Sequence, residues 1–341
     1  MSSKLLNIKD TEVAMPGLYD TRLPPVYITG FYDMLIFIKS KRKPRRIKIF
    51  GSDGKTYDFL LKGHEDLRQD ERVMQTLSLV NNLLRKNDKT EKKELTIITY
   101  PVIPLSTNTG LLGWVKGCDT LNQLVVDYRA NKHTAKDVES EIVRDLCPNY
   151  QTVLVPHKLE VYRFILENTK GEDLKKVLWL RSENAEVWLA RRVNYVRSLA
   201  TMSMVGYILG LGDRHLSNIM LQRISGKIVH IDFGDLFEVP MLRKEVPEKV
   251  PFRLTRMLVK AMEACGIEGN YKITCLNVME VLRENKESLL AILESFATDP
   301  LLNRKLIIAE YQNYTDLAQK QAGKQVSFGD VNNSSNFRYS N

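Results

Sequence analysis

Two short stretches of the sequence decide the fold: Gly210-Leu211-Gly212-Asp213-Arg214-His215-Leu216-Ser217-Asn218 and His230-Ile231-Asp232-Phe233-Gly234-Asp235. The chain between them carries apolar runs at 219–221 and 228–231, on either side of Ser225-Gly226. Two such runs around a two-residue loop predict a β-hairpin. In that hairpin residue 219 would face residue 232, so the side chains of Asn218 and Asp232 are expected to meet at its open end.

The residues expected at this point suit the transfer of a phosphoryl group. A carboxylate beside an amide oxygen is a donor set for a hard cation such as Mg²⁺. Asp213 adds a second carboxylate that could act as a base on a hydroxyl, and phosphoryl transfer depends mainly on positioning and charge neutralisation. Turn or cap chemistry explains each of these residues equally well when it is taken alone, and only the combination favours a catalytic site.

The elements around this hairpin predict a chain of two lobes. Strands are expected at residues 32–38, 46–50, 56–61, 95–102 and 111–115, with a helix at 66–85. Beyond Thr120 the pattern is mainly helical, with helices expected at 121–129, 186–211, 254–265 and 274–297. The sequence therefore predicts an α+β fold in which a small β-rich lobe with one long helix joins a large helical lobe near Trp114-Val115.

Lys62 is the candidate for the opposite wall of a cleft between the lobes. It ends a predicted strand just before a helix that carries Glu65, Asp66 and Asp70. A lysine in this place can reach the phosphates of a nucleotide while a helix carboxylate holds it. The alternative is a solvated lysine at a strand end.

Gly113-Trp114-Val115 lies where the lobes are expected to join. The ring of Trp114 could stack on a purine, and the backbone of Val115 could offer it hydrogen bonds. The alternative is that Trp114 belongs to the core. The glycine-rich phosphate loops GxGxxG and GxxxxGK[ST] are missing from the sequence, which argues against an ordinary protein kinase and a P-loop ATPase.

Composition narrows the class of protein. The chain has 341 residues, of which 43% are hydrophobic, which is ample for a buried core. No apolar run is long enough to span a bilayer, and there is no secretory signal at the start. The four cysteines lack zinc-site spacing and fit a reducing compartment. The net charge of +9 is concentrated partly in residues 39–48, which lack aromatics and are therefore interpreted as a solvated loop and not a nucleic-acid site.

Several sequence motifs match those of a known family. They include 62–72 (KGHEDLRQDER), 103–108 (IPLSTN), 113–115 (GWV), 206–215 (GYILGLGDRH), 251–257 (PFRLTRM) and 269–271 (GNY). From about residue 5 to residue 310 the chain resembles the kinase domain of the phosphatidylinositol-3-kinase-related protein kinases, in particular the target-of-rapamycin (TOR) branch. The resemblance implies the bilobal kinase fold of the phosphatidylinositol 3- and 4-kinase type, and phosphorylation of serine and threonine in proteins in growth and nutrient signalling.

The resemblance also assigns roles to residues of this chain. Asp213 would accept the proton of the substrate hydroxyl, His215 would stabilise the transferring phosphoryl group, and Asn218 and Asp232 would bind Mg²⁺. The residues implied to contact the phosphates of ATP are Ser40 and Arg42 in the loop above them and Lys62, with Asp70 as its carboxylate partner and Glu65 nearby. The residues implied to line the adenine pocket are Leu60, Tyr100, Gly113, Trp114, Val115, Thr120, Met220 and Ile231.

The implied organisation divides the chain into a leader (1–38), a small lobe (39–114), a large lobe (115–320) and a disordered polar tail (321–341). Within the large lobe, residues 130–168 would dock a WD-repeat β-propeller subunit, and 232–257 would be the activation loop. Scaffold proteins of the TOR complex would be further partners, in the cytoplasm or at endomembranes through those partners. The family's helical scaffold, its rapamycin-binding domain and its short carboxyl-terminal domain are not found in the sequence. The chain is therefore expected to be a fragment, an engineered form or an incomplete gene product, and to be unstable or poorly active alone.

Two other functions remain open. An inositol lipid kinase would share the cleft and the Asp-Phe-Gly motif. Its activation loop, however, would need a basic cluster for inositol phosphates, whereas residues 236–249 carry three bases (Arg243, Lys244, Lys249) offset by three acids (Glu238, Glu245, Glu248). A protein substrate is therefore favoured. An inactive scaffold is the second alternative, against which the presence of Lys62, Asp213, Asn218 and Asp232 argues.

Overall fold

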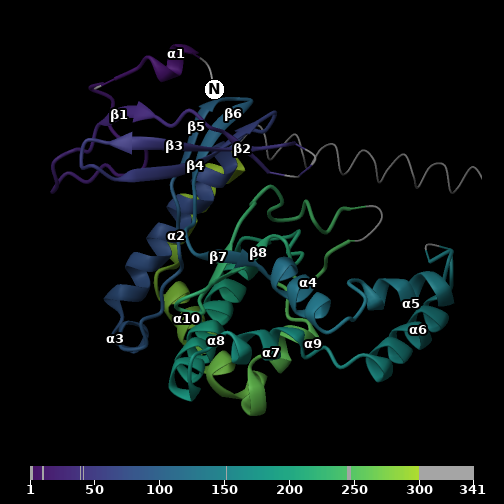
Figure 1. Cartoon of the computed structure of the whole chain (residues 1–341). Coiled ribbons are helices and arrows are strands. Elements are labelled where there is room, and N and C mark those ends of the chain that lie inside the picture. The colour runs from purple at the N-terminus through teal and green to yellow at the C-terminus, as the bar shows by residue number, and fades with distance from the viewer. Residues whose placement is uncertain are drawn as a thin grey trace, which may run out of the picture.

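The computed structural model describes residues 3–298, except residues 10, 39, 41, 151 and 244–246. A small lobe built on one sheet stands above a larger helical lobe (Figure 1). The expected bilobal α+β architecture is confirmed. The tail predicted to be disordered, 321–341, lies outside the described residues.

The small lobe is an antiparallel sheet that follows a short helix, α1 (Ser3–Leu6). Its strands are β1 (Ile28–Phe31), β2 (Ile36–Phe37), β3 (Arg45–Gly51), β4 (Thr56–Gly63), β5 (Val102–Ser106) and β6 (Thr109–Gly113). They lie in the order β1-β3-β4-β6-β5, and β2 also pairs with β3. Alternation along β3 turns Ile47 and Ile49 into a core shared with Phe59 of β4. The single strand expected at 32–38 is wrong, because β1 ends at residue 31 and only 36–37 pair.

One long helix, α2 (Arg68–Lys86), connects the two lobes, and the short α3 (Asp88–Glu91) follows it. Val73, Leu77, Val80 and Leu84 recur on one face and are buried, as their spacing predicts. Below the sheet α2 packs against β5 and reaches α10 of the large lobe (Figure 1). The largest hydrophobic core therefore runs through both lobes and fixes one against the other.

The strand expected at 95–102 is wrong, since β5 begins only at Val102. Leu95 and Ile97 do alternate inward as in a strand, but they pack into the core beside α2. The side chain of Asn81 takes the place of a neighbouring strand: its Nδ2 donates to Ile97 O at 2.9 Å, and Ile97 N donates to its Oδ1 at 2.8 Å. A helix side chain thus satisfies the backbone that a ladder would otherwise pair.

The large lobe consists of helices around a three-stranded sheet ordered β7-β8-β9. Its elements are β7 (Cys118–Thr120), α4 (Leu121–Asn131), α5 (Val138–Leu146), α6 (Val155–Asn168), α7 (Asp173–Leu180), α8 (Ala185–Ile208), β8 (Ile219–Gln222), β9 (Ile228–His230), α9 (Arg256–Lys260), η1 (Glu263–Cys265), η2 (Ile267–Tyr271), α10 (Lys272–Glu284) and α11 (Lys286–Ala297). The second half of α8 is buried at the centre of the lobe, and α5 and α6 stand out to one side (Figure 1).

Three expected helices are shorter in the structure than in the prediction. The helix of 186–211 ends at Ile208, ahead of Gly210 with its left-handed φ of 55°. That of 254–265 is reduced to α9, and that of 274–297 is divided into α10 and α11. At the division, Asn285 Nδ2 donates to Val281 O at 2.8 Å and so ends α10 by bonding its own helix.

The hairpin that organises the site has a longer loop than predicted. Ile219 pairs with His230, and Gln222 N donates to Lys227 O at 2.9 Å, so residues 223–226 form the turn. Gly226 has a φ of 74°, and a Cβ on it would lie 2.7 Å from Arg191 O, which explains the glycine. The predicted pairing of 219 with 232 is therefore wrong by two residues, and the open end of the hairpin lies at Asn218 and Ile231.

Candidate active site

Asp213 lies in the loop between α8 and β8 with a left-handed backbone, φ 56°. A backbone in this region is strained in a residue other than glycine and needs contacts that hold it. Asn218 supplies one, because its Nδ2 donates to Asp213 O at 2.9 Å. Asn218 is only 6% exposed. Because its Nδ2 donates to Asp213 O, its Oδ1 is the side-chain atom that remains to bind a cation.

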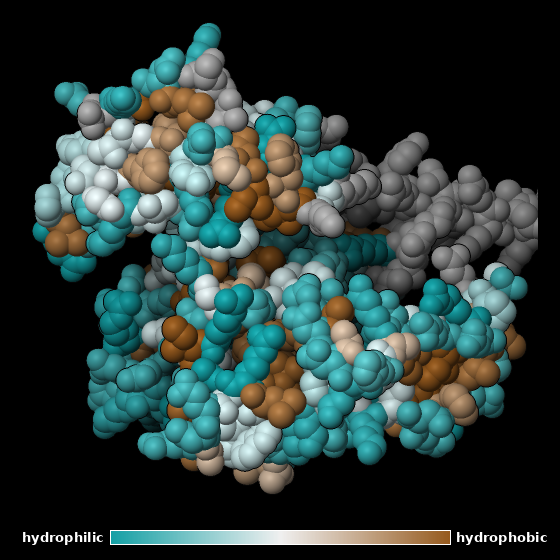
Figure 2. All heavy atoms as spheres, in the orientation of Figure 1, coloured by the Kyte–Doolittle hydropathy of each residue, from teal (hydrophilic) through white to brown (hydrophobic). Residues whose placement is uncertain are grey.

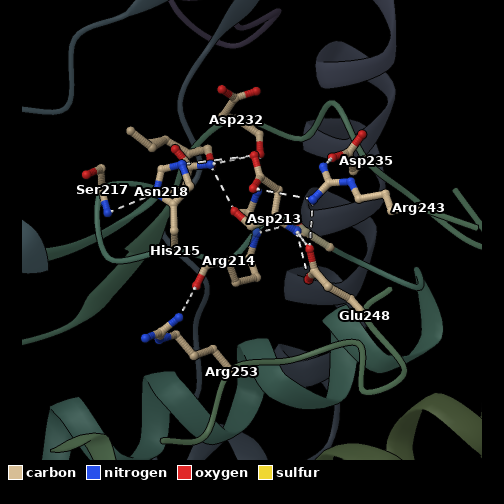
Figure 3. Close-up of polar contacts among 12 residues, drawn as sticks. Asp213, Arg214, His215, Ser217, Asn218, Asp232, Asp235, Arg243, Glu248 and Arg253 are labelled. Atoms are coloured by element: carbon tan, nitrogen blue, oxygen red, sulfur yellow. Dashed lines mark hydrogen bonds and ion pairs between the residues drawn. The ribbon is translucent and has the colours of Figure 1, made fainter. Parts of the chain in front are cut away.

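Arg214 ties this loop to the end of the hairpin (Figure 3). Its Nε donates to Gly212 O at 2.7 Å, its Nη1 to Ile231 O at 2.9 Å, and its Nη2 to Asp232 O. Burial lowers the pKa of Arg214, against the opposing effect of Asp232 and Asp213. Bonding a buried guanidinium to three carbonyls offsets its desolvation and locks the two segments together.

Asp232 follows directly on the residue that pairs with Asn218, because Ile231 N donates to Asn218 O at 3.1 Å. Asp232 also has a left-handed backbone, φ 61°. Figure 3 shows Asp213, Asn218 and Asp232 brought together from the loop and the two ends of the hairpin. The structure thus places the three residues on adjoining segments, with Asn218 bonded to Asp213, despite the shift in register.

Asp70 of α2 meets this group from the small lobe. It is 2% exposed, and its Oδ1 accepts a hydrogen bond from Phe233 N at 3.1 Å. Burial raises the pKa of Asp70 to about 6, although Lys62 and the Phe233 N–H both favour the ionised form. A carboxylate of α2 therefore holds the backbone next to Asp232.

Lys62 pairs with a different carboxylate from the one expected. Its Nζ lies 3.3 Å from Glu65 Oε1, and Arg42 Nη1 lies 2.7 Å from Glu65 Oε2. The predicted ion pair of Lys62 with Asp70 is thus replaced by a pair with Glu65, three residues along the chain. Glu65 joins the lysine to the loop that carries Arg42, while Asp70 is committed to Phe233.

A cavity of about 630 Å³ lies between these groups, and Figure 2 shows the surface hollowed between the lobes. The predicted site residues on its walls are Ser40, Arg42, Lys62, Glu65, Asp70, Asp213 and Asp232. The wall residues that the sequence reasoning did not select include Pro44, His64, Gln69 and Asp235. Asn218 and His215 are not among the described residues that line the cavity, and His215 Nε2 is 4.0 Å from Asp213 Oδ2.

None of the residues implied for the adenine pocket is among the described residues that line the cavity. Leu60, Tyr100, Val115 and Ile231 belong to or pack on the core that joins the lobes. Thr120 pairs with Met220 across β7 and β8, and its Oγ1 accepts from Gln123 N at the start of α4. Gly113 is the last residue of β6 and pairs with Phe59 of β4.

Trp114 and Val115, at the junction of the lobes, differ in the hydrogen bonds of their backbone groups. Trp114 N donates to Asp58 O at 2.9 Å, and the guanidinium of Arg46 lies over its ring at 4.5 Å. Within the described part of the chain, neither backbone group of Val115 takes part in a hydrogen bond. Val115 is therefore the residue at this junction whose N–H and C=O remain for a ligand.

Two charged residues of the predicted activation loop, Arg243 and Glu248, also contact Asp213. Arg243 Nη1 lies 3.7 Å from Asp213 Oδ1 and 3.0 Å from Glu248 Oε1, and its Nη2 pairs with Asp235. Glu248 accepts from the backbone N–H of Asp213. No local pattern points to the contacts with Asp213, which lies 30 residues from Arg243 and 35 residues from Glu248 in the sequence.

Comparison with known proteins agrees with this geometry. The sequence model of the family described as phosphatidylinositol 3- and 4-kinase matches residues 56–306. The chain belongs to this family.

Curated relatives place the chain within the family as its sequence motifs predict. It is 56% identical over 306 residues to the serine/threonine-protein kinase TOR of Arabidopsis thaliana. The aligned region covers 90% of this chain and 12% of that protein. It is also 56% identical over 307 residues to the serine/threonine-protein kinase mTor of Drosophila melanogaster, with coverage of 90% and 12%. The predicted resemblance is confirmed. The chain spans about an eighth of the length of these relatives.

Solved structures show the same fold. The FAT and kinase domain of CtTel1 aligns with a TM-score of 0.71 at 28% identity, covering 92% of this chain and 23% of that one. The complete CtTel1 dimer aligns with a TM-score of 0.73 at 29% identity, covering 88% of this chain and 12% of that one. None of the helices described for this chain is long and apolar enough to cross a membrane.

Proposed function

We propose that this chain transfers a phosphoryl group from ATP to serine and threonine hydroxyls of proteins, with Mg²⁺, as a TOR-like kinase. The observation that carries the proposal is one cavity with Lys62 on the wall from the small lobe and with Asp213 and Asp232 on the wall from the large lobe. A cation for the phosphates and two carboxylates facing it are the parts that positioning and charge neutralisation require.

The charges on the cavity walls argue that a divalent ion accompanies the nucleotide. The acidic side chains are Glu65, Asp66, Asp70, Asp213, Asp232 and Asp235, and the basic ones are Arg42 and Lys62. Such a surplus of carboxylates repels a bare triphosphate and attracts cations. Among the described residues there is no cluster of three His, Cys, Asp or Glu that would hold a metal by itself. That fits Mg²⁺, which binds through one or two protein oxygens together with substrate phosphates.

The proposed roles follow from the contacts. Asn218 Oδ1 and the Asp232 carboxylate would hold Mg²⁺, which supplies charge neutralisation when it is bound. Asp213 would accept the proton of the substrate hydroxyl, and His215 would stabilise charge beside it. Lys62, oriented by Glu65, would contact the phosphates, with Ser40 and Arg42 above them. Asp70 would hold the backbone before Gly234 through Phe233.

The adenine would lie next to the cavity at the junction of the lobes. The residues proposed to surround it are Leu60, Tyr100, Gly113, Trp114, Val115, Thr120, Met220 and Ile231. The free backbone groups of Val115 support this placement, because a purine edge needs one donor and one acceptor.

A protein substrate is favoured over an inositol lipid. Arg243, one of the three bases of the activation segment, is paired with Asp213, Asp235 and Glu248 and so is not free to hold an inositol phosphate. The curated relatives are named serine/threonine-protein kinases.

The insertion at 130–168 is proposed to dock a WD-repeat β-propeller subunit. Helix α6 and the residue before it expose Leu154, Val155, Tyr162 and Phe164, an apolar surface of the kind that protein partners cover. Arg129 anchors the insertion through Glu139 at 2.8 Å and Asp173 at 3.0 Å. Scaffold proteins of a TOR complex and residence in the cytoplasm or at endomembranes belong to the same proposal.

Transfer of labelled phosphate from ATP tests the function directly. The chain is assayed with a serine/threonine peptide library and with phosphoinositide vesicles, with and without Mg²⁺ and with and without a β-propeller partner. We expect peptide labelling that needs Mg²⁺ and is abolished in Lys62→Met and Asp232→Ala. Labelling of vesicles alone would establish a lipid kinase. Nucleotide binding that depends on Mg²⁺ but gives no labelling, even with the partner, would establish an inactive scaffold.

A further inference from the structure

Glu248 contacts the backbone of Asp213 across 35 residues of sequence. Asp213 N lies 3.1 Å from both Oε1 and Oε2 of Glu248, so the N–H points between the two carboxylate oxygens. Hydrogen bonds to a charged acceptor are stronger than neutral ones. Figure 3 shows Glu248 beneath the Asp213 loop, on the side away from Asp232.

Arg243 contacts both Glu248 and Asp213. Its Nη1 lies 3.0 Å from Glu248 Oε1 and 3.7 Å from Asp213 Oδ1, and its Nη2 pairs with Asp235. One guanidinium thus connects the proposed base, the residue that holds the base's backbone, and the start of the activation segment. All four side chains meet at one point in Figure 3.

Glu248 adds support on the N–H side of Asp213, whereas Asn218 bonds the carbonyl of Asp213. The side chain of Asp213 is 41% exposed, so packing does not fix the carboxylate, and its backbone has a left-handed φ of 56°. The activation segment approaches the loop closely, since a Cβ on Gly212 would lie 2.2 Å from Pro240. A loop in this state depends on the segment packed against it for its conformation.

We infer that Glu248 is a positioning residue for Asp213, acting as the acceptor of its backbone N–H, and that Arg243 links this acceptor to the carboxylate of Asp213. The inference rests on the proposed function for the role of Asp213. Its consequence is that the proposed base is in place only when residues 243 and 248 of the activation segment are. The fold of that segment then sets the rate of phosphoryl transfer and leaves nucleotide binding unchanged.

Two variants separate the acceptor from the ion pair. Glu248→Gln keeps an oxygen for the Asp213 N–H and loses the charge that pairs with Arg243, whereas Glu248→Leu loses both. Misplacement of a reacting group by about 1 Å costs on the order of 100-fold in rate. We expect kcat to fall about 10- to 100-fold in Glu248→Leu and within about 5-fold of the unsubstituted chain in Glu248→Gln, with the KM for ATP changed less than about 2-fold in both.

The matched control is Glu238→Leu, which removes an exposed carboxylate of the same segment and is expected to leave kcat unchanged. Equal losses in Glu248→Gln and Glu248→Leu, matched by Arg243→Leu, would show that the ion pair alone matters and overturn the acceptor role. A rise in the KM for ATP equal to the fall in kcat would mean general damage to the cleft and would also overturn it.

Hydrogen exchange of the Asp213 amide gives a readout that does not need turnover. Mass spectrometry with residue resolution is expected to show protection of this amide in the unsubstituted chain and in Glu248→Gln, and its loss in Glu248→Leu. Unchanged protection in Glu248→Leu contradicts the inference whether or not the chain is a kinase. Loss of protection in a chain that labels no peptide leaves the contact established and refutes the proposed function instead.

Discussion

Replacing Asp70 by Asn is expected to stabilise the fold while it impairs the site. Asp70 is 2% exposed, and burial raises its pKa to about 6 from an ordinary value of 3.8. Burial therefore outweighs Lys62 and the Phe233 N–H, the two groups that favour its charge. Asn has nearly the same shape, and its Oδ1 can still accept from Phe233 N, so the variant removes the buried charge and keeps the hydrogen bond.

The size of the effect follows from the two pKa values. A carboxyl whose pKa is higher in the folded chain binds more protons there, so the free energy of unfolding falls as pH rises through the interval. At 1.36 kcal/mol per unit, the interval from 3.8 to about 6 corresponds to about 3 kcal/mol above pH 6. About 2 kcal/mol of this develops between pH 4.5 and pH 7.5. The Asp70→Asn variant does not lose this part of the free energy of unfolding as the pH rises.

Urea unfolding of both chains at pH 4.5 and pH 7.5 measures the difference. We expect the variant to gain about 2 kcal/mol on the unsubstituted chain between the two pH values, and to transfer phosphate more slowly because the cavity loses one of its cation-attracting charges. Such a gain of stability with a loss of activity is typical of a residue kept for function. A variant that is less stable at pH 7.5, or that shows the same pH dependence as the unsubstituted chain, would refute the reasoning.

Two further perturbations test the surroundings of the site. His230 is 8% exposed, and burial, with Arg214 nearby, lowers its pKa to about 3. A base whose pKa is depressed in the folded chain destabilises the fold as pH falls below about 6.5, by about 2 kcal/mol at pH 5. Urea unfolding should therefore show that His230→Leu loses less stability between pH 7 and pH 5 than the unsubstituted chain. Equal losses in the two chains would contradict this prediction. Gly210 has a φ of 55°, and a Cβ on it would lie 2.5 Å from Phe237 Cα, so Gly210→Ala should lower the free energy of unfolding by at least about 2 kcal/mol. An unchanged melting temperature would show that the loop accommodates a side chain.

The local parts of the fold could be predicted from the sequence because each depends on neighbouring residues. The spacing of Val73, Leu77, Val80 and Leu84 predicts α2, and its buried face is the one the spacing gives. The hairpin after Asn218 also follows from its apolar runs. Its register could not be fixed in this way, because a turn of two residues and one of four both suit Ser-Gly, and the choice depends on Arg191 packed against Gly226.

The contacts between distant segments could not be predicted, since no local pattern encodes them. Leu95 and Ile97 alternate like a strand, and only the position of Asn81 on α2 shows that a side chain pairs the backbone of Ile97. In the same way Arg243 and Glu248 look like balanced surface charges in the sequence. Their contacts with Asp213 require the fold to bring residues 213, 243 and 248 together.

The contacts of the site connect the two lobes through backbone atoms next to the proposed chemical groups. Asp70 of the small lobe holds Phe233 N beside Asp232, and Glu248 of the predicted activation loop holds Asp213 N. Arg214 then bonds the carbonyls of Gly212 and Asp232, so both carboxylates share one support. A shift of α2 or of the activation segment therefore moves the position of a carboxylate and does not change its identity. Control of the proposed site would act on the rate of transfer through geometry, because contacts from other segments hold the backbone beside each proposed catalytic carboxylate.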